Sequence, residues 1–348
     1  MVDNDKQTSY QDFENEVDKS LKIDRRLAVL DFKESEDFLF ITTDSTENAK
    51  RISTMYAEVK RDFRIKVALL PLARLHNQAK GICHVGVAPV RRSSASASEQ
   101  VTQVLYGETF DTLDVTENWV RVRLHIDGYV GWVSRGQVTL LSEKGLVAFL
   151  SIPIIRVAEK VVPLYKRPDP DSEVLREAML GNSLAIVGKK GKFLEVKTPD
   201  GKKVYVLKSA TTRSMRDKID FSLKHLFDDA KDLQGISYIW GGRSPHGFDC
   251  SGFTQTVFAL NGISLPRDAD LQYRQGEPVG NDTSRLRPGD LLFFSSNGNK
   301  IEHVAIYVGK NKTFIHSSEY VRVNSFDRGR KDFSKKLLSR FIGARRIV

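Results

Sequence analysis

The sequence contains little cysteine, with only Cys83 and Cys250 among 348 residues. Two thiols form at most one disulfide, which excludes a small scaffold held together by disulfides. A disulfide between them would also remove the only thiols available for chemistry, so we expect both cysteines to be free. Long apolar runs are absent as well. We therefore expect neither a membrane-spanning helix nor a signal peptide.

Acidic residues are outnumbered, since 54 Lys and Arg face 44 Asp and Glu and give a formal net charge of +10. A basic chain invites a nucleic-acid interpretation, but no aromatic stacking platform or nucleic-acid motif accompanies the charge. We expect no nucleic-acid partner and interpret the basic C-terminal run as a solvated face. Only Asp332 balances that run, which contains Arg328, Arg330, Lys331, Lys335, Lys336, Arg340, Arg345 and Arg346.

The length allows two to four domains, and 40% hydrophobic residues are enough to form their cores. Residues 1–20 are polar and charged, which predicts a mobile lead. Residues 21–76 contain strand-like runs at 27–30 and 66–70 around a helical stretch at 47–61. We interpret them as a small α/β unit of unknown role.

Two segments about seventy residues apart form a divergent repeat. Short alternating strands with glycine turns predict two small β-barrels. The second copy has Lys202 and Lys203 where the first has Tyr129 and Val130, so it is interpreted as a spacer. The matching runs are 98–107, 119–122 and 127–133 in the first copy and 172–181, 193–196 and 200–206 in the second.

Cys250 lies where a turn rich in glycine and proline gives way to an apolar helix, predicted over about 251–261. Peptide N–H groups and partial positive charge at a helix N-terminus favour thiolate over thiol, and the thiolate is the nucleophile. A free cysteine is as often a small buried hydrophobe. Its partners decide between the two interpretations.

Two histidines follow on successive predicted strands, His303 in the run 303–308 and His316 in the run that begins at 313. The tight turn between the runs predicts an antiparallel hairpin that brings the imidazoles together. Thiol catalysis needs one imidazole to move the proton and a third group to orient it. We assign His303 as the base and His316 as the orienting residue. Taken singly, each histidine could also be a strand residue without chemistry.

These residues resemble the NlpC/P60 family of papain-like cysteine peptidases of bacterial cell-wall metabolism. The resemblance covers about the last third of the chain and implies an α+β fold in which a helix packs on an antiparallel sheet. Six elements occur in the family's order: 238–242, 248–253, 265–268, 287–291, 303–307 and 314–316.

The resemblance implies that Cys250 is the nucleophile, His303 the base and His316 the third polar residue. Tyr238 resembles the tyrosine whose hydroxyl, with the backbone N–H of Cys250, stabilises the oxyanion. The alternative for Tyr238 is an aromatic anchor of the core. The resemblance implies no metal and no cofactor.

The two barrels resemble bacterial SH3-like domains. Two of them ahead of this peptidase type are most similar to the γ-D-glutamyl-L-diamino acid endopeptidases, which recycle cell-wall peptides and require a free N-terminal L-alanine. An ammonium group entering a pocket needs a carboxylate. The resemblance implies that the substrate-binding residues are Asp249, Ser251, Asp268, Tyr129, Arg267 and Trp240.

Three alternatives stay open among these residues. Asp249 could serve as a helix N-cap. Asp268 could cap a helix over about 269–275. Tyr106 competes with Tyr129 for the position that the first barrel lends to the site.

The expected domains are a lead and α/β unit at 1–76, SH3-like domains at 77–143 and 144–212, and the peptidase at 213–348. The expected reaction, through a thioester, cleaves the bond between γ-D-Glu and L-Lys or diaminopimelate and releases L-Ala-D-Glu from stem peptides. Intact peptidoglycan should be cut poorly. We expect a monomer, in the envelope or periplasm if a leader was removed and otherwise in the cytoplasm.

Two other functions compete with this one. A wall-binding protein with an inert peptidase domain would lack part of the catalytic set, and no part is missing here. An acyltransferase or amidase with the same Cys-His machinery would have an apolar groove beside Cys250.

Overall fold

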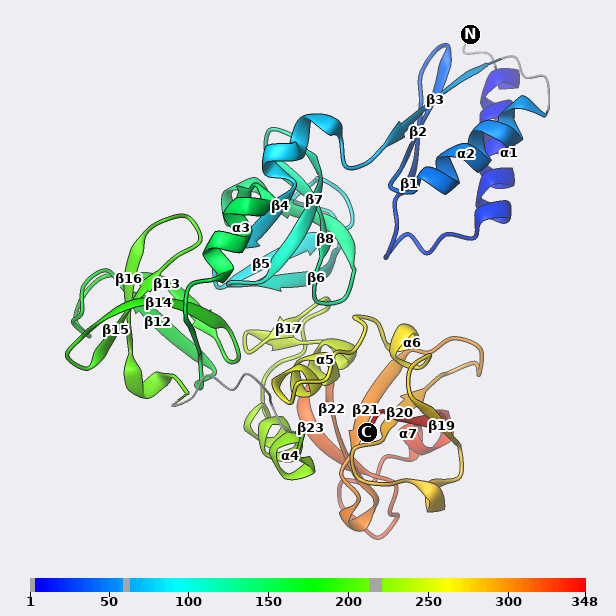
Figure 1. The fold of residues 1–348 in the computed structure, drawn as a ribbon. Helices are drawn as coiled ribbons and strands as arrows, with labels where there is room; N and C mark the ends of the chain where they lie inside the picture. The colour runs from blue at the N-terminus through cyan, green and yellow to red at the C-terminus, as the bar shows by residue number, and fades with distance from the viewer. Residues whose placement is uncertain (1–3, 59–62, 213–220) are drawn as a thin grey trace.

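The computed structural model describes residues 4–58, 63–212 and 221–348. Figure 1 shows four units: a small α/β unit, two β-barrels and a mixed unit that contains the C-terminus. None of the helices in the described ranges is long and apolar enough to cross a membrane. Both cysteines are free, as expected, and both are buried.

The N-terminal unit is a three-stranded sheet of order β1-β2-β3 with two helices against it (Figure 1). Strands β1 and β2 are antiparallel, whereas β2 and β3 are parallel because α2 connects them. The elements are α1 (Asn4–Leu21), β1 (Leu30–Glu34), β2 (Phe38–Thr43), α2 (Thr46–Ala57) and β3 (Arg64–Leu69).

The predicted mobile lead is wrong for the described part of residues 1–20. Helix α1 buries Tyr10, Phe13 and Val17 in the core of this unit. Their spacing of three and four residues is the helical period, but the polar residues between them masked the signal. The sequence prediction also missed β2.

The two barrels share one strand order. The first sheet runs β10-β4-β7-β8-β9-β5-β6 and the second runs β11-β14-β15-β16-β12-β13, so their common strands follow the same path. The predicted repeat therefore corresponds to a repeated topology. The first barrel consists of β4 (Lys80–Cys83), β5 (Val87–Arg91), β6 (Gln100–Leu105), β7 (Thr109–Val115), β8 (Trp119–Leu124), β9 (Val130–Ser134) and β10 (Val138–Leu141).

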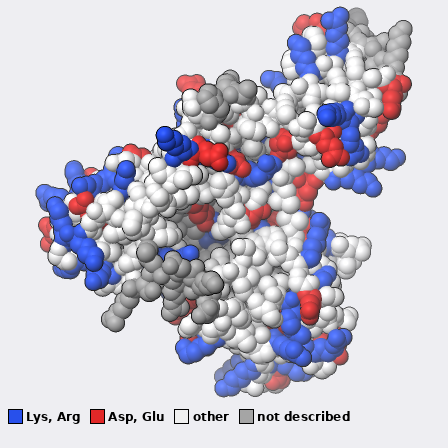
Figure 2. Space-filling view, viewed as in Figure 1, with Lys and Arg blue, Asp and Glu red and all other residues white. Residues whose placement is uncertain are grey.

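Helix α3 (Glu143–Leu150) connects the barrels. Figure 2 shows Lys and Arg gathered at the outer end of the second barrel. Lys189 and Lys190, in the hairpin of β14 and β15, are exposed. Arg328, Lys331 and Lys335 in the C-terminal run are also exposed, which fits a solvated face. The second barrel consists of β11 (Ile154–Arg156), β12 (Val161–Tyr165), β13 (Val174–Met179), β14 (Ser183–Lys190), β15 (Phe193–Lys197) and β16 (Lys203–Leu207).

The C-terminal unit packs helix α5 (Cys250–Leu260) on an antiparallel sheet of order β19-β24-β20-β21-β22-β23. Residues 250–258 of α5 are all buried, because the sheet covers one face and strands from the turn and first barrel lie near the other. The remaining elements are α4 (Leu223–Asp232), β17 (Arg243–Ser244), β18 (Gly247–Phe248), α6 (Ala269–Gln272), β19 (Glu277–Gly280), β20 (Leu291–Phe294), β21 (His303–Tyr307), β22 (Thr313–Ser318), β23 (Tyr320–Ser325), α7 (Lys335–Arg340) and β24 (Phe341–Arg346).

The N-terminal unit docks on the first barrel through both apolar and charged contacts. Val29 and Leu70 share a buried cluster with Leu113 and Val130 of the barrel. The N–H of Val130 donates to the carbonyl of Arg26 at 2.7 Å. The segment between α1 and β1 is thereby held beside the barrel, at the end that faces α6 (Figure 1).

Candidate active site

Cys250 is the first residue of α5, and the turn before it is held by hydrogen bonds to Asp249. The side chain of Asp249 accepts from the N–H of Gly252 at 2.7 Å and from the N–H of Gly241 at 2.9 Å. The first bond is an N-cap, so this alternative for Asp249 is realised. Gly252 must be glycine, because a Cβ there would collide with the carbonyl oxygen of Gly242.

Burial disfavours the charged form of the Cys250 thiol. Burial raises its pKa to about 12, and the nearby carboxylate of Asp249 acts in the same direction. The loss of solvent opposes the effect of the helix N-terminus, so a thiolate at this position stays a prediction. A hydrogen bond between Cys250 and the backbone of Val304 places the sulfur beside β21, next to His303.

His303 and His316 lie on the paired strands β21 and β22, and their rings are joined by a hydrogen bond. Nε2 of His303 is 2.7 Å from Nδ1 of His316, and Nε2 of His316 is 2.9 Å from Oδ1 of Asn324. The amide of Asn324 is oriented in turn, since its Nδ2 donates to the carbonyl of Asp332 at 2.9 Å. The predicted hairpin is confirmed, and Asn324 on β23 extends it.

This chain of bonds assigns the tautomers of both imidazoles. Oδ1 of Asn324 only accepts, so His316 carries its proton on Nε2 and leaves Nδ1 as an acceptor. His303 then donates from Nε2 to that acceptor. Its Nδ1 keeps a free lone pair, which is what a base for a thiol requires.

Both imidazoles are neutral near pH 7. Burial lowers the pKa of His316 to about 4, against the opposing hydrogen bond to Asn324. Burial lowers the pKa of His303 well below its usual value, and the neighbouring His316 and Arg322 add to this effect. Burial thus favours the uncharged forms of both the thiol and its base.

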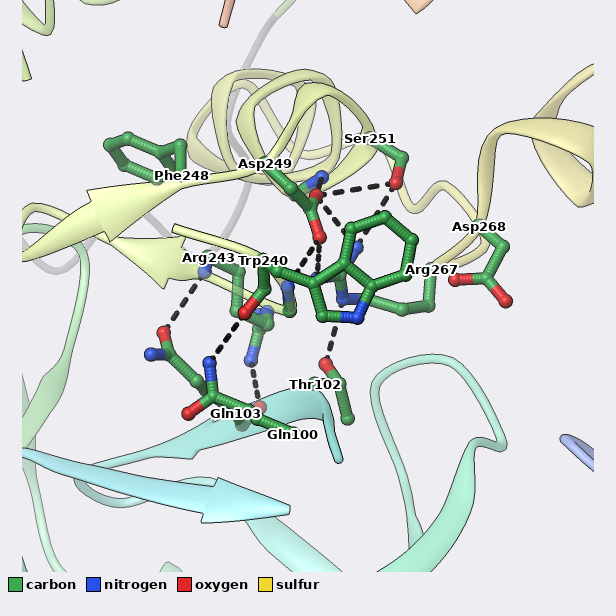
Figure 3. Close-up of polar contacts among 12 residues, drawn as sticks. Gln100, Thr102, Gln103, Trp240, Arg243, Phe248, Asp249, Ser251, Arg267 and Asp268 are labelled. Atoms are coloured by element: carbon green, nitrogen blue, oxygen red, sulfur yellow. Dashed lines mark hydrogen bonds and ion pairs between the residues drawn. The ribbon is translucent and has the colours of Figure 1, made fainter. Parts of the chain in front are cut away.

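Tyr238 and Trp240 lie on the turn that precedes α5 and line the same pocket as Cys250. Burial raises the pKa of Tyr238, and Cys250 contributes next, so the hydroxyl remains a donor. Trp240 bridges to the first barrel. Its carbonyl accepts from Gln100 at 2.8 Å (Figure 3), and its Nε1 donates to Glu99 at 2.9 Å.

Arg267 forms a fully buried ion pair under the start of α5 (Figure 3). Two of its nitrogens donate to the carboxylate of Asp249 at 2.6 and 3.0 Å, and one of them also donates to Ser251 Oγ at 3.1 Å. Its Nε donates to Thr102 of β6 at 2.8 Å. Arg267 therefore fixes the predicted residues Asp249 and Ser251 and ties them to the first barrel.

Asp268 immediately precedes α6, but its side chain makes no capping bond to that helix. The carboxylate turns instead toward the first barrel and the N-terminal unit. Its Oδ2 accepts from the hydroxyl of Tyr129 at 3.3 Å and from Arg26 at 2.8 Å. Tyr106 lies elsewhere, buried in the core of the second barrel, so Tyr129 is the tyrosine that the first barrel lends to the pocket.

The pocket has a volume of about 250 Å³. This volume is small for a ligand site and suits the end of a longer ligand molecule. Charged groups line much of it, from the segment at Arg26, from the first barrel and from residues 300–302 ahead of β21. The described residues contain no group of three or more His, Cys, Asp or Glu arranged to hold a metal.

Sequence reasoning missed Asn324 and Arg26. Asn324 lies on an alternating strand one position before Ser325, where an asparagine carries no motif. Arg26 lies in a charged stretch, Asp24-Arg25-Arg26, that was assigned to a unit without a role. Only the pairing of β22 with β23, and the docking of the N-terminal unit, bring these residues to the site.

Two family models match the chain. The NlpC/P60 family matches residues 235–341, and the bacterial dipeptidyl-peptidase Sh3 domain matches residues 90–138. The first match covers Cys250, His303, His316 and Asn324, and the second covers Tyr129. Neither model reaches residues 1–76.

Two curated relatives are named gamma-D-glutamyl-L-lysine dipeptidyl-peptidase. The one from Bacillus cereus is 33% identical over 64% of this chain and 68% of its own length. The one from Bacillus subtilis is 31% identical over 62% of this chain and 71% of its own length.

A solved structure shares the arrangement of the larger part of the molecule. It is the crystal structure of an NlpC/P60 family protein from Bacillus cereus, with a TM-score of 0.66 and 25% identity. The match covers 77% of this chain and 99% of that chain. The chain therefore belongs to the NlpC/P60 family of cysteine peptidases and is a hydrolase.

Proposed function

We propose that this protein is an endopeptidase for short murein stem peptides that begin with a free L-alanine. It cleaves after γ-D-glutamate, before an L-diamino acid, and releases L-Ala-D-Glu. The observation that carries the proposal is the carboxylate of Asp268, held by Tyr129 and Arg26 in the same small pocket as Cys250.

The chemistry starts with a proton transfer from the thiol of Cys250 to Nδ1 of His303. The sulfur attacks the γ-carbonyl carbon of D-glutamate, and the hydroxyl of Tyr238 with the N–H of Cys250 receives the developing oxyanion. Collapse of this intermediate breaks the amide bond, and His303 gives its proton to the departing amine. Water, activated by the same imidazole, then hydrolyses the thioester and restores the thiol.

Asp268 is suited to receive the substrate's ammonium group. Its Oδ2 is already occupied by Tyr129 and Arg26, whereas none of the described residues donates to Oδ1. Asp249 is less available, because Arg267 and two backbone N–H groups already donate to its carboxylate. We therefore assign the ammonium contact to Asp268. Asp249, Ser251 and Arg267 support the pocket from below, and Trp240 forms part of its wall.

A peptide whose alanine is amide-linked to muramic acid has no ammonium group for Asp268. It also continues past the alanine, where Tyr129 and Arg26 line the end of the pocket. Oδ1 of Asp268 would be covered without a partner, which is costly. This end of the pocket thus favours free peptides over the intact polymer.

The test compares L-Ala-γ-D-Glu-L-Lys with its N-acetylated form, with products identified by mass spectrometry. The names of the two relatives make L-lysine the diamino acid to test first. We expect kcat/KM for the free peptide to be higher by about 100-fold or more, as for a lost contact between charged groups. Equal rates on both peptides would contradict the proposed selection.

The Cys250→Ala protein is the control for the nucleophile. It should bind the free tripeptide, as calorimetry can measure, and it should release no L-Ala-D-Glu. Undiminished turnover would remove the assignment of Cys250.

An acyltransferase with an apolar acyl groove is disfavoured, because charged residues line the pocket beside Cys250. They are Arg26, Glu99, Asp268 and Lys300.

A further inference from the structure

Arg26 belongs to the N-terminal unit, yet its guanidinium lies in the peptidase pocket. One nitrogen, Nη1, donates to Asp268 Oδ2 at 2.8 Å and to Asp270 Oδ1 at 2.7 Å. Nη2 donates to Asp270 Oδ2 at 2.8 Å and to Asp24 Oδ2 at 2.7 Å. Nε donates to Asp24 Oδ1 at 2.9 Å. The side chain is about a quarter exposed, so these bonds are largely shielded from water.

The backbone of Arg26 is fixed as firmly as its side chain. Its N–H donates to Oδ1 of Asp24 at 3.1 Å, which closes an Asx-type turn. Its carbonyl accepts from the N–H of Val130, the residue after Tyr129. Arg26 and Tyr129 therefore approach the same oxygen of Asp268 from two segments that are bonded to each other.

The charge balance argues that Arg26 orients Asp268 rather than competing with the substrate for it. Two guanidiniums, those of Arg26 and of Arg274 at 3.7 Å from Asp270, face the three carboxylates of Asp24, Asp268 and Asp270, so the cluster keeps a negative charge. Arg26 uses only Oδ2 of Asp268, as Tyr129 does. The remaining oxygen can take one ammonium group without displacing any bond.

We propose that Arg26 is a positioning residue for substrate selection, which makes the N-terminal unit a part of the peptidase's substrate pocket. It holds Asp268 so that Oδ1 faces the ammonium group of the N-terminal alanine. This inference rests on the proposed function, and it assigns a role to residues 21–76 that the family models leave unmatched.

Loss of Arg26 should also change the protonation of Asp268. Burial raises the pKa of this carboxyl group, whereas Arg267 and Arg26 act to lower it. The other groups that face it are Asp270, which raises its pKa, the protonated hydroxyl of Tyr129, and Arg92 farther along the barrel wall. Loss of Arg26 removes a cation, so more of Asp268 is protonated in weak acid.

The experiment compares Arg26→Ala and Arg26→Lys with the wild-type protein on the free and N-acetylated tripeptides. The matched control is Arg25→Ala, because Arg25 is half exposed and pairs only with Asp18 among the described carboxylates. We expect Arg26→Ala to raise KM for the free peptide about tenfold with kcat within about twofold, the size of one charged hydrogen bond. The KM of Arg26→Lys should lie between those of the wild type and Arg26→Ala. The KM of Arg25→Ala should match that of the wild type.

The pH profile separates positioning from a merely structural role. For Arg26→Ala the acid limb of kcat/KM on the free peptide should move to higher pH, while the slow reaction on the acetylated peptide keeps its profile. In a double-mutant cycle, Arg26→Ala should add little to Asp268→Asn, because both changes act on one contact.

Three outcomes would overturn the inference. An unchanged KM for Arg26→Ala would show that Arg26 does not position Asp268 for the substrate. A lower KM would make it a competitor for Asp268. Additive effects in the double-mutant cycle would show that it does not act through Asp268. Failure of the proposed function is distinct from these, because it would appear in the wild type as equal rates on the two peptides.

Discussion

At the scale of single residues, the site depends on a chain of neutral groups that fixes one proton arrangement. Asn324 orients His316, and His316 orients His303, so that the lone pair of His303 is left for the thiol. Burial disfavours the charged forms of both imidazoles and of the thiol. In the proposed reaction, donors placed at the developing oxyanion therefore matter more than they would in water.

Replacement of Asn324 by alanine should reduce kcat without a large change in KM. His316 could then adopt either tautomer, and half of the arrangements would present a proton to the thiol in place of a lone pair. We expect a loss on the order of 100-fold in kcat, as for other orienting residues. Steady-state kinetics on the free tripeptide measure it, with exposed Asn281→Ala as the matched control. A rise in KM at constant kcat would show that Asn324 affects binding instead.

His316 should make the stability of the fold depend on pH. Its pKa is about 4 in the folded protein and about 6.5 unfolded, so the unfolded chain binds more protons between these values. The free energy of unfolding is therefore full above pH 6.5 and decreases as the pH falls toward 4, by about 3 kcal/mol. Denaturant unfolding of the wild type and of His316→Gln at pH 7 and pH 4.5 measures it. An equal loss in both proteins would assign the effect to other groups.

The positions of the candidate catalytic residues could be predicted from sequence because each lies in a short motif with a fixed local structure. Cys250 stands at a helix start, and the two histidines stand on strands joined by a tight turn. The thiol's charge state could not be predicted in the same way. It depends on how much water the sheet and the first barrel exclude, which is a property of the assembled fold.

At the scale of elements, the close approach of α5 to the preceding turn positions the sulfur. Asp249 caps the helix and also accepts from the N–H of Gly241, so its carboxylate joins the turn to the helix.

The periodic elements were predictable to within about a residue, since α5 and the strands β20 to β22 have strong apolar patterns. Helix α1 and strand β2 were missed, because their apolar residues are interrupted by polar ones or lie next to charged turns.

Gly252→Ala tests this close approach. The added methyl group meets the carbonyl oxygen of Gly242, which is backbone and cannot move aside cheaply. We expect a loss of about 1–3 kcal/mol in stability, as for other overpacked sites, and a larger loss in kcat than in binding. Gly298→Ala is not a suitable control, since that residue has a positive φ of 77°. Gly145→Ala is suitable, because its Cβ would make only ordinary contacts. Wild-type activity in Gly252→Ala would show that the turn can relax.

At the scale of the whole molecule, buried polar contacts join the first barrel to the peptidase. Arg243 of β17 is only 2% exposed, and it donates to Glu108 at 2.6 Å and to the carbonyl of Gln103 at 3.2 Å. The backbone N–H of Arg243 donates to the side chain of Gln103 at 2.9 Å. No sequence pattern marked these residues, because the contact joins positions about 140 apart in the chain.

Glu108→Ala should weaken this interface, because it leaves the buried guanidinium of Arg243 without its carboxylate. We expect a loss of about 3 kcal/mol, the cost of breaking a buried ion pair from one side. Scanning calorimetry should show a lower melting temperature, and separate transitions for barrel and peptidase if the interface is what couples them. The control is Glu117→Ala, an exposed glutamate of the same barrel. An unchanged melting temperature would mean that the other contacts of Arg243 suffice.

The end of the pocket formed by Arg26, Tyr129 and Asp268 also bears on how such an enzyme can evolve. The cutting machinery is contained in one stretch of chain and can be inherited as a module by any protein that acquires it. The proposed selectivity cannot be inherited in this way, because the three residues on which it depends lie in three separate units of the chain. A recombination that transfers the peptidase unit alone would transfer the candidate catalytic residues without Arg26 and Tyr129. Arg26, Tyr129 and Asp268 are therefore expected to change together in evolution, as parts of one assembly.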